Sequence, residues 1–191
     1  MGSRSWALGW TVVASFGASA AMAQTAEFTC AKPGTVVDFS DGTRTTWQGP
    51  EGNHCKVLTK QPSGDERLAN WYAPTLALPA ARSQALADQI KPWTLWPLSV
   101  GKKITGRFDG EGQTGPGSWA ETTTVDSYEK LTTRGGTFDV FLVTHQEEAI
   151  SHKYRSTFRQ WYAPALGAVV KFTLVDNQGS NRAAEATAIR Q

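Results

Sequence analysis

Two histidines and two acids near residue 150 form the densest group of side chains able to do chemistry. His145, Glu147, Glu148 and His152 lie within one short stretch. If the flanking segments form a hairpin, His145 and His152 face each other across it. The spacing is not that of an H-E-x-x-H zinc motif, and the sequence fixes no third ligand. We therefore predict a charged, solvated hairpin tip and no metal site.

No catalytic motif is recognisable elsewhere in the chain. There are many serines but no G-x-S-x-G turn, and only three histidines. Glu147 and Glu148 are adjacent, so on a strand they point to opposite faces. The glycine-rich stretch 109–117 does not match a phosphate-binding pattern. We expect no catalytic residue and no cofactor. The competing class is a hydrolase of envelope material that uses acids with His145 or His152.

The two cysteines, Cys30 and Cys55, lie 25 positions apart. In an exported protein an even pair indicates one disulfide, and the bridge serves stability. His54 precedes Cys55, which leaves a reactive or metal-bound thiol as the alternative.

The tryptophans say more about a possible function than the candidate catalytic or metal-binding residues do. Six tryptophans follow residue 23: Trp47, Trp71, Trp93, Trp96, Trp119 and Trp161. Packing in the core of a β protein explains most of them. The functional alternative is a lipid or carbohydrate groove lined by a few, for which Trp71, Trp119 and Trp161 are the candidates.

Residues 1–23 have the pattern of a secretory signal peptide. Arg4 supplies the positive region, an apolar run follows, and Ala21-Met22-Ala23 matches a cleavage site. A membrane anchor is the alternative, although the run is short and rich in small residues. We predict a periplasmic or secreted protein, with no membrane span after cleavage and a single β-rich domain over residues 24–191. Without Arg4 there are 18 basic and 17 acidic residues, which gives no argument for nucleic acid.

A repeated word organises the mature chain. Trp71-Tyr72-Ala73-Pro74 returns as Trp161-Tyr162-Ala163-Pro164. Each copy is expected to end a strand, since proline lacks the N–H that a central ladder needs. A glycine turn and a glycine-led strand precede both copies in the same order. We therefore predict two related β units, over about 28–78 and 96–175, whose superposition brings Trp71 onto Trp161.

The segments around these words read as strands with one exception. Asp41-Gly42 predicts a hairpin turn, and the loop 109–117 is expected to be exposed and mobile. Residues 181–190 form a polar edge strand in this interpretation. The one helix is predicted over Pro79–Lys91, ended by Pro92, with an extended connector over residues 92–97.

Neighbouring residues on a strand face opposite ways, which separates the two aromatics of the second word. Tyr162 shares its face with Phe158 and Tyr154 and should point into the core. Trp161 shares its face with Arg159 and should point to the wetter side, covered by a loop, the helix or a ligand.

Residues from about 96 to 175 resemble an uncharacterised family of exported Gram-negative proteins. The matching residues are Gly136-Thr137-Phe138 and the stretch from Trp161 to Lys171, whereas Thr133-Arg134-Gly135 departs from the V-P-A that the family often has. The resemblance implies a curved antiparallel sheet like the half-barrels of periplasmic lipoprotein carriers, and no catalytic residues. The leading hypothesis is a non-enzymatic binding protein. Its expected partner is a lipid or other apolar envelope-derived ligand, a glycan, or an envelope protein. A structural role in an envelope assembly is a third class.

Overall fold

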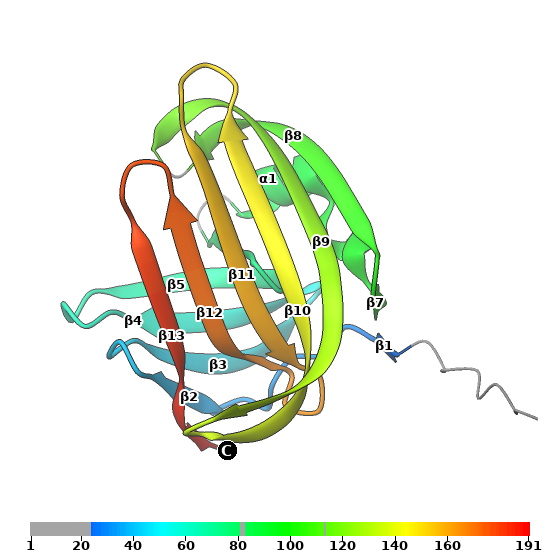
Figure 1. Cartoon of the computed structure of the whole chain (residues 1–191), viewed down its shortest axis with the longest axis vertical. Helices are drawn as coiled ribbons and strands as arrows, with labels where there is room; N and C mark the ends of the chain where they lie inside the picture. Colours follow the sequence, from blue (N-terminus) through cyan, green and yellow to red (C-terminus); the bar gives the residue numbers. More distant parts are fainter. Residues whose placement is uncertain (1–23, 81–82, 113) are drawn as a thin grey trace, which may run out of the picture.

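The computed structural model describes residues 24–80, 83–112 and 114–191 (Figure 1). These residues form mainly strands, with one α-helix and one 3-10 helix. The elements of the N-terminal half are β1 (Thr25–Ala26), β2 (Val36–Phe39), β3 (Arg44–Glu51), β4 (His54–Lys60), β5 (Glu66–Ala73), β6 (Leu76–Pro79), α1 (Ser83–Ile90) and the 3-10 helix η1 (Pro92–Leu95). The remaining elements are β7 (Leu98–Ser99), β8 (Lys103–Gly112), β9 (Gly115–Thr133), β10 (Gly136–Ala149), β11 (Arg155–Ala163), β12 (Ala168–Asp176) and β13 (Asn181–Arg190).

Eleven of the strands form one antiparallel sheet in the order β6-β5-β4-β3-β2-β13-β12-β11-β10-β9-β8. The sheet curls, so that β2–β5 cross behind the long strands β9–β13 (Figure 1). This confirms the predicted curved, half-barrel-like sheet. We call β2–β6 the first leaf and β8–β13 the second leaf.

Strand β13 is not the edge strand that its polar sequence predicts. It pairs with β12 on one side and β2 on the other, and so joins the two leaves. Its alternation explains the position: Ala184 and Ala186 are buried on the inner face, while Glu185 between them is only partly buried. Small inward side chains suit a strand at which a sheet bends sharply.

The helix is shorter than predicted. Pro79 belongs to β6, where it pairs with Ala69, and α1 begins at Ser83. The helix packs against both β8 and β6, the outer strands of the curled sheet, and buries Leu86 and Ile90. It thereby fills part of the concave side. The connector after it is the 3-10 helix η1, so the prediction of an extended segment there is wrong.

Apart from residue 113, which the structure does not describe, the glycine-rich stretch 109–117 belongs to the paired strands of a β-hairpin, where the sequence predicts a loop; its predicted mobility stays a prediction. Strands β8 and β9 stay paired from Lys103↔Thr124 to Gly112↔Gly115. Glycine is required here for close approach rather than for flexibility. A Cβ on Gly112 would lie 2.1 Å from the Trp119 indole.

Both W-Y-A-P words end a strand, at Ala73 in β5 and at Ala163 in β11. In each word the pairing to the following strand shifts register, between Trp71 and Ala73 and between Trp161 and Tyr162. A register shift of this kind bends the strand and re-aims its side chains. The two words therefore occupy similar places, and superposition of the whole units stays a prediction.

The predicted disulfide between Cys30 and Cys55 is confirmed, with the Cα atoms 5.7 Å apart. It ties the segment before β2 to β4. The same segment contacts the second word: the Ala31 amide donates to the Gly167 carbonyl (3.1 Å) and the Tyr162 hydroxyl donates to the Thr29 carbonyl (3.1 Å). The N-terminal segment thus links the two leaves.

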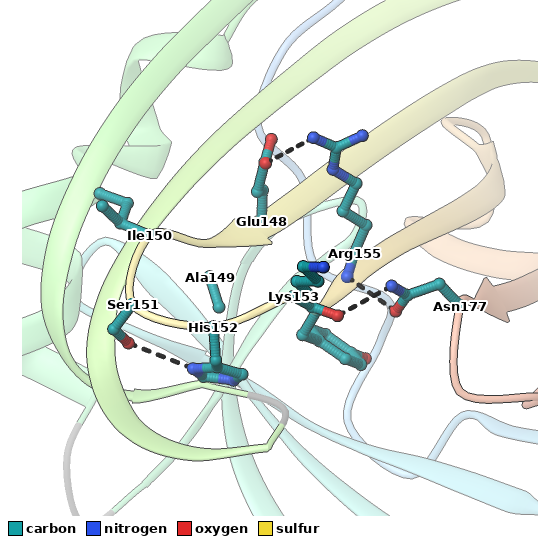
Figure 2. A pocket seen from close by; sticks show the side chains of 9 residues that line it. Glu148, Ala149, Ile150, Ser151, His152, Lys153, Arg155 and Asn177 are labelled. Atoms are coloured by element: carbon teal, nitrogen blue, oxygen red, sulfur yellow. Dashed lines mark hydrogen bonds and ion pairs between the residues drawn. The ribbon is translucent and has the colours of Figure 1, made fainter.

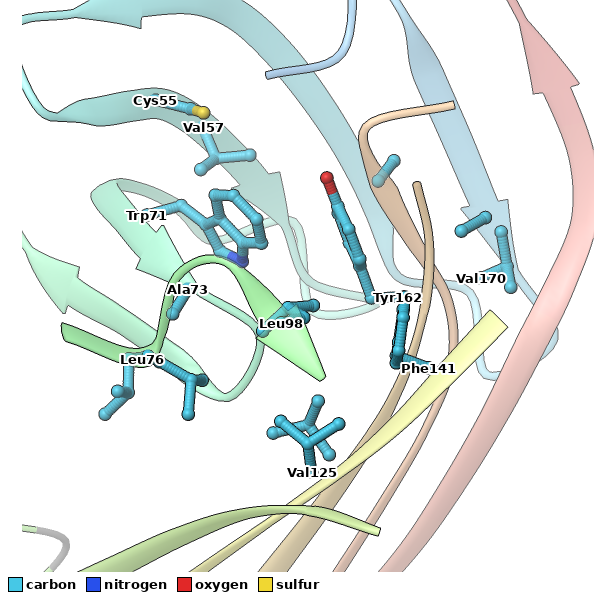
Figure 3. Packing of buried hydrophobic residues seen from close by; sticks show 14 of the residues in the cluster. Cys55, Val57, Trp71, Ala73, Leu76, Leu98, Val125, Phe141, Tyr162 and Val170 are labelled. Atoms are coloured by element: carbon cyan, nitrogen blue, oxygen red, sulfur yellow. The ribbon is translucent and has the colours of Figure 1, made fainter. Parts of the chain in front are cut away.

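The core lies between the leaves and is mainly aromatic and branched aliphatic. Trp71 from β5, Tyr162 and Phe141 from the second leaf, and Leu98 from β7 pack into one cluster (Figure 3). Burying side chains of this size contributes about 1.5–3 kcal/mol each.

Candidate functional site

A cleft of about 240 Å³ opens between the two leaves, on the part of the concave side that the helix does not fill. Both leaves line it. Its apolar walls are formed by Phe39, Val57 and Ala69 from the first leaf, and by Phe158, Phe172 and Leu174 from the second. A hollow walled by apolar side chains with a few polar groups is the usual form of a small-molecule site.

Two tryptophans of the first leaf form one end of the cleft. Trp47 and Trp71 are 2% and 3% exposed, and their rings meet edge to face with centroids 5.1 Å apart. Tyr162 stacks on Trp71 from the second leaf, with 5.6 Å between centroids. The cleft is therefore anchored on the aromatic cluster of the core, which holds both indoles rigidly.

Two residues that line the cleft have an indole N–H group without a hydrogen-bond partner among the described residues. They are Trp47 and Trp71, and both N–H groups are buried. Buried polar groups in folded proteins are almost always paired. Because these nitrogen atoms are buried, the indoles present their carbon atoms, and not their N–H groups, to the open cleft.

Strand alternation and register place the lining residues. Thr43, Thr45 and Trp47 recur at every second position after the Asp41-Gly42 turn and so share one face. In the ladder Trp47 lies opposite Val57, and Thr45 lies opposite Thr59. The wall therefore changes from aromatic and aliphatic at one end to hydroxyl-bearing at the other.

Arg182 is the one charged side chain among the described residues that line the cleft. It is 48% exposed and donates to the Asp41 carboxylate at 3.0 Å. Burial raises the pKa of Asp41, but hydrogen bonds from Thr43 and Arg182 outweigh it and hold that pKa below its ordinary value. The rim thus carries a formed ion pair.

Of the three tryptophans proposed from the sequence, the structure brings Trp71 to the cleft. Trp119 is fully buried in the second leaf, stacked on Phe108 and donating its N–H to the Gly110 carbonyl (3.2 Å). Trp161 lies half-exposed on the opposite face of β11 from Tyr162, which is buried as predicted. Trp71, Trp119 and Trp161 therefore do not line one common groove.

Neighbouring strands contact Trp161, whose cover by a ligand stays a prediction. The Lys171 ammonium lies 4.7 Å from the ring centroid, and the indole N–H donates to the Glu129 carboxylate at 3.0 Å. A cation over an indole face is a stabilising contact in its own right.

His145 belongs to a buried acid cluster on the inner face of the second leaf. Its Nε2 lies 3.9 Å from the Glu121 carboxylate and 3.8 Å from that of Glu147, and its Nδ1 is 2.9 Å from the Thr123 hydroxyl. Burial raises the pKa of Glu121 to about 7, with His145 lowering it and Glu147 raising it. Within the described ranges this cluster lines neither hollow, and no three such side chains are arranged to hold a metal ion.

His152 does not face His145, which corrects the hairpin prediction. Strands β10 and β11 pair Glu148 with Arg155, and His145 lies opposite Phe158. His152 therefore falls in the turn, beside a surface hollow of about 580 Å³ (Figure 2). The polar groups there contact one another: Arg155 donates to Glu148 at 2.8 Å, and Asn177 to the Lys153 carbonyl at 2.9 Å. This is the charged hairpin tip that the sequence predicts.

Sequence reasoning missed Trp47 and Thr43 as site residues. A signal was present, because the alternation after Asp41-Gly42 puts both on one face with Thr45. Nothing local to that strand indicates that this face meets Phe172 and Leu174, more than a hundred positions later. The cleft exists only through the curl of the sheet.

The predicted signal peptide, residues 1–23, lies outside the described residues. In the ranges that are described, no helix has the length and apolar character needed to cross a membrane.

Comparisons with known proteins found structures but no family. No protein-family model matches the chain, and no curated protein matches it. Two solved structures are similar over 87% of this chain and 100% of their own. One is a presumed exported protein with a YmcC-like fold from Bacteroides fragilis, at 10% identity and a TM-score of 0.40. The other is a presumed lipoprotein from Parabacteroides distasonis, at 14% identity and a TM-score of 0.43.

Proposed function

We propose that this chain is a non-catalytic, exported binding protein whose cleft takes up the apolar part of a small envelope-derived molecule. One observation carries the proposal. A hollow of about 240 Å³ between the two leaves has mainly apolar walls and is bordered by the side chains of Trp47 and Trp71. Placing the apolar part of a small molecule against such walls removes apolar surface from water, which favours binding. The signal-like residues 1–23 support export.

The size of the cleft bounds the ligand. It exceeds the ~150 Å³ of an engineered apolar cavity that holds benzene. It is smaller than the roughly 300 Å³ at which pockets for drug-sized molecules begin. A single chain or a small aromatic molecule fits this range, whereas a whole two-chain lipid does not.

Titration with N-phenyl-1-naphthylamine, a neutral fluorophore that brightens in apolar sites, tests the proposal. The wild-type chain should give saturable binding of one probe per molecule. Ala69→Phe adds a ring to the cleft wall and should abolish binding. Leu68→Phe is the matched control, because Leu68 is the next residue on β5 and is 42% exposed outside the cleft. Equal binding by the wild type and Ala69→Phe, or no saturable binding by the wild type, contradicts the proposal.

Two competing classes remain distinguishable by the fate of the bound molecule. A hydrolase of envelope material would convert it, so mass spectrometry before and after incubation would show a product. A structural component of an envelope assembly would bind neither the probe nor an extracted small molecule. The proposed binding protein returns its ligand with an unchanged mass.

A further inference from the structure

We infer that the ligand of the cleft is a single-chain amphiphile with an anionic head group. The head lies at the end of the cleft that Thr45 and Thr59 form, and the chain extends toward Trp71. This inference rests on the proposed function and adds the orientation of the ligand and the charge of its head group. It predicts that the cleft distinguishes an anionic amphiphile from a neutral one of the same chain length.

The polarity of the cleft wall changes along the first leaf. Trp47 lies opposite Val57 in the β3–β4 ladder, and the next pair on the same face is Thr45 opposite Thr59. Gln61 follows at the same end, directly after β4, and lines the cleft with them. The side chains of Thr45, Thr59 and Gln61 form no hydrogen bond within the described residues, and their polar atoms are not among those that the fold buries without a partner. These polar atoms are therefore accessible to a molecule in the cleft.

The other end of the cleft suits a hydrocarbon chain. Its walls include Ala77 and Val169, and the Trp71 indole presents carbon atoms to it. Gln160 is the polar side chain there, and its carboxamide oxygen already accepts a hydrogen bond from the Thr75 amide at 2.6 Å. A charged head group at this end would lose its water without gaining a counter-charge, because no ionisable side chain of the described residues lines it.

Two arginines supply positive charge at the polar end. Arg182 lines the cleft and gives one N–H to Asp41, whereas a guanidinium has several N–H donors. Arg67 lies opposite Thr59 in the β4–β5 ladder, and residues directly opposite each other share one face of a sheet, so Arg67 is on the cleft face. Arg67 is exposed and forms no ion pair with a described residue. Guanidinium and hydroxyl groups together provide the donors that an anionic oxygen accepts from.

The acids near this end leave Arg67 without a counter-charge. Asp41 is bonded to Arg182 at 3.0 Å, and Asp65 accepts a hydrogen bond from a serine hydroxyl of the β4–β5 turn at 2.7 Å. Glu66 neighbours Arg67 on β5 and so points to the opposite face of the sheet. An anionic head group beside Arg67 therefore meets a cation that has no partner, and it displaces no existing ion pair.

Displacement of the bound fluorophore by three amphiphiles of equal chain length tests the inference. Octanoate and octyl phosphate are the anions, and 1-octanol is their neutral counterpart. At low salt at least one anion should bind about tenfold more tightly than 1-octanol, which is the gain expected from charge-assisted hydrogen bonds. Salt at about 1 M should remove most of this preference, because it shortens the Debye length to about 3 Å. The anion that binds more tightly identifies the head group as a carboxylate or a phosphate.

Arg67→Gln and Arg182→Gln each remove one guanidinium. Each change should lower the ratio of anion to 1-octanol affinity about threefold, and the double variant should bring that ratio to about one, with the 1-octanol affinity unchanged. Arg159→Gln is the matched control and should keep the wild-type ratio. Arg159 is an exposed arginine next to Phe158 on β11, so it points away from the cleft that Phe158 lines.

Each outcome decides the question. Equal binding of the anions and 1-octanol by the wild type overturns the inference while leaving the apolar cleft intact. An anion preference that survives in the double variant also overturns it, because the two arginines then do not hold the head group. Failure of the fluorophore to bind the wild type removes the proposed function itself. A variant that fails to fold by circular dichroism is set aside, and the salt dependence of the wild type gives the answer.

Discussion

The two W-Y-A-P words are identical in sequence but differ in whether the polar atoms of their aromatic side chains are hydrogen-bonded. In the second word both polar tips are paired: Trp161 donates to Glu129 and Tyr162 to the Thr29 carbonyl. In the first word neither the Trp71 N–H nor the Tyr72 hydroxyl has a partner among the described residues, although both side chains are at most 3% exposed. The two identical words, at similar strand ends, therefore differ in whether neighbouring residues provide hydrogen-bond partners for their Trp and Tyr side chains.

The difference extends over the two leaves. Every buried side-chain nitrogen or oxygen without a partner in the described chain lies between Thr35 and Tyr72. The second leaf buries an even more polar group, the cluster of Glu121, His145 and Glu147, yet places these side chains against one another and against Thr123. Folded proteins provide hydrogen-bond partners for almost all of the polar groups that they bury. The two leaves therefore differ in how fully their buried polar side chains are paired.

The largest expected effect separates the two aromatics of the second word. Tyr162 is fully buried and stacks on Trp71, so Tyr162→Ala should lower the free energy of unfolding by about 3–5 kcal/mol. Trp161 is half-exposed, and Trp161→Ala should cost about 1 kcal/mol. Urea unfolding curves of the two variants give both numbers. A larger loss for Trp161→Ala would reverse the assignment of faces.

The acid cluster predicts how stability changes with pH. The pKa of Glu121 is about 7 in the folded chain against 4.5 for the free side chain. Between these pH values the folded state holds a proton that the unfolded chain releases, so the free energy of unfolding falls as pH rises from about 4.5 to 7. The loss from this group is up to roughly 3 kcal/mol.

Glu121→Gln should remove that part of the pH dependence. Glu148→Gln is the matched control, because Glu148 is an exposed acid on β10 paired with Arg155. Chemical unfolding at a series of pH values compares the three proteins. The same slope in the wild type and Glu121→Gln would mean that the buried cluster does not titrate in this range.

The smallest effect compares the two tyrosine hydroxyls directly. Tyr162→Phe removes a hydroxyl with an acceptor and should cost about 1 kcal/mol. Tyr72→Phe removes a buried hydroxyl without one, and should be neutral or stabilise the fold by up to about 1 kcal/mol. Thermal unfolding resolves the difference. Equal losses from both changes would remove the distinction between the leaves.

Much of the fold follows from local pattern. The strand alternation, the Asp41-Gly42 hairpin, the cysteine pair and the inward face of Tyr162 all depend on neighbours in sequence. The errors share a cause that local pattern does not contain. Residues 181–190 have the polar sequence of an edge strand. Their central position in the sheet comes from pairing with β2, near the other end of the chain, which the local sequence does not reveal. The hairpin at 109–117 looks like a loop because Trp119 sets its need for glycine.

The site was less predictable than the fold for the same reason. Trp71 was proposed from its word, but Trp47 and Thr43 become site residues only when the first leaf meets the second. An unpaired N–H is a property of the assembled surroundings, so no spacing in the sequence marks it. Conversely, Trp119 and Trp161 look like binding aromatics until the structure provides their partners.

Native mass spectrometry of the chain isolated gently from the cells that produce it tests the central claim most directly. The account predicts one small molecule per chain, carried by the wild type and by Leu68→Phe and absent from Ala69→Phe. A wild-type chain that carries nothing, or an Ala69→Phe chain that carries the same molecule, would contradict the proposal that the cleft between the two leaves binds a ligand.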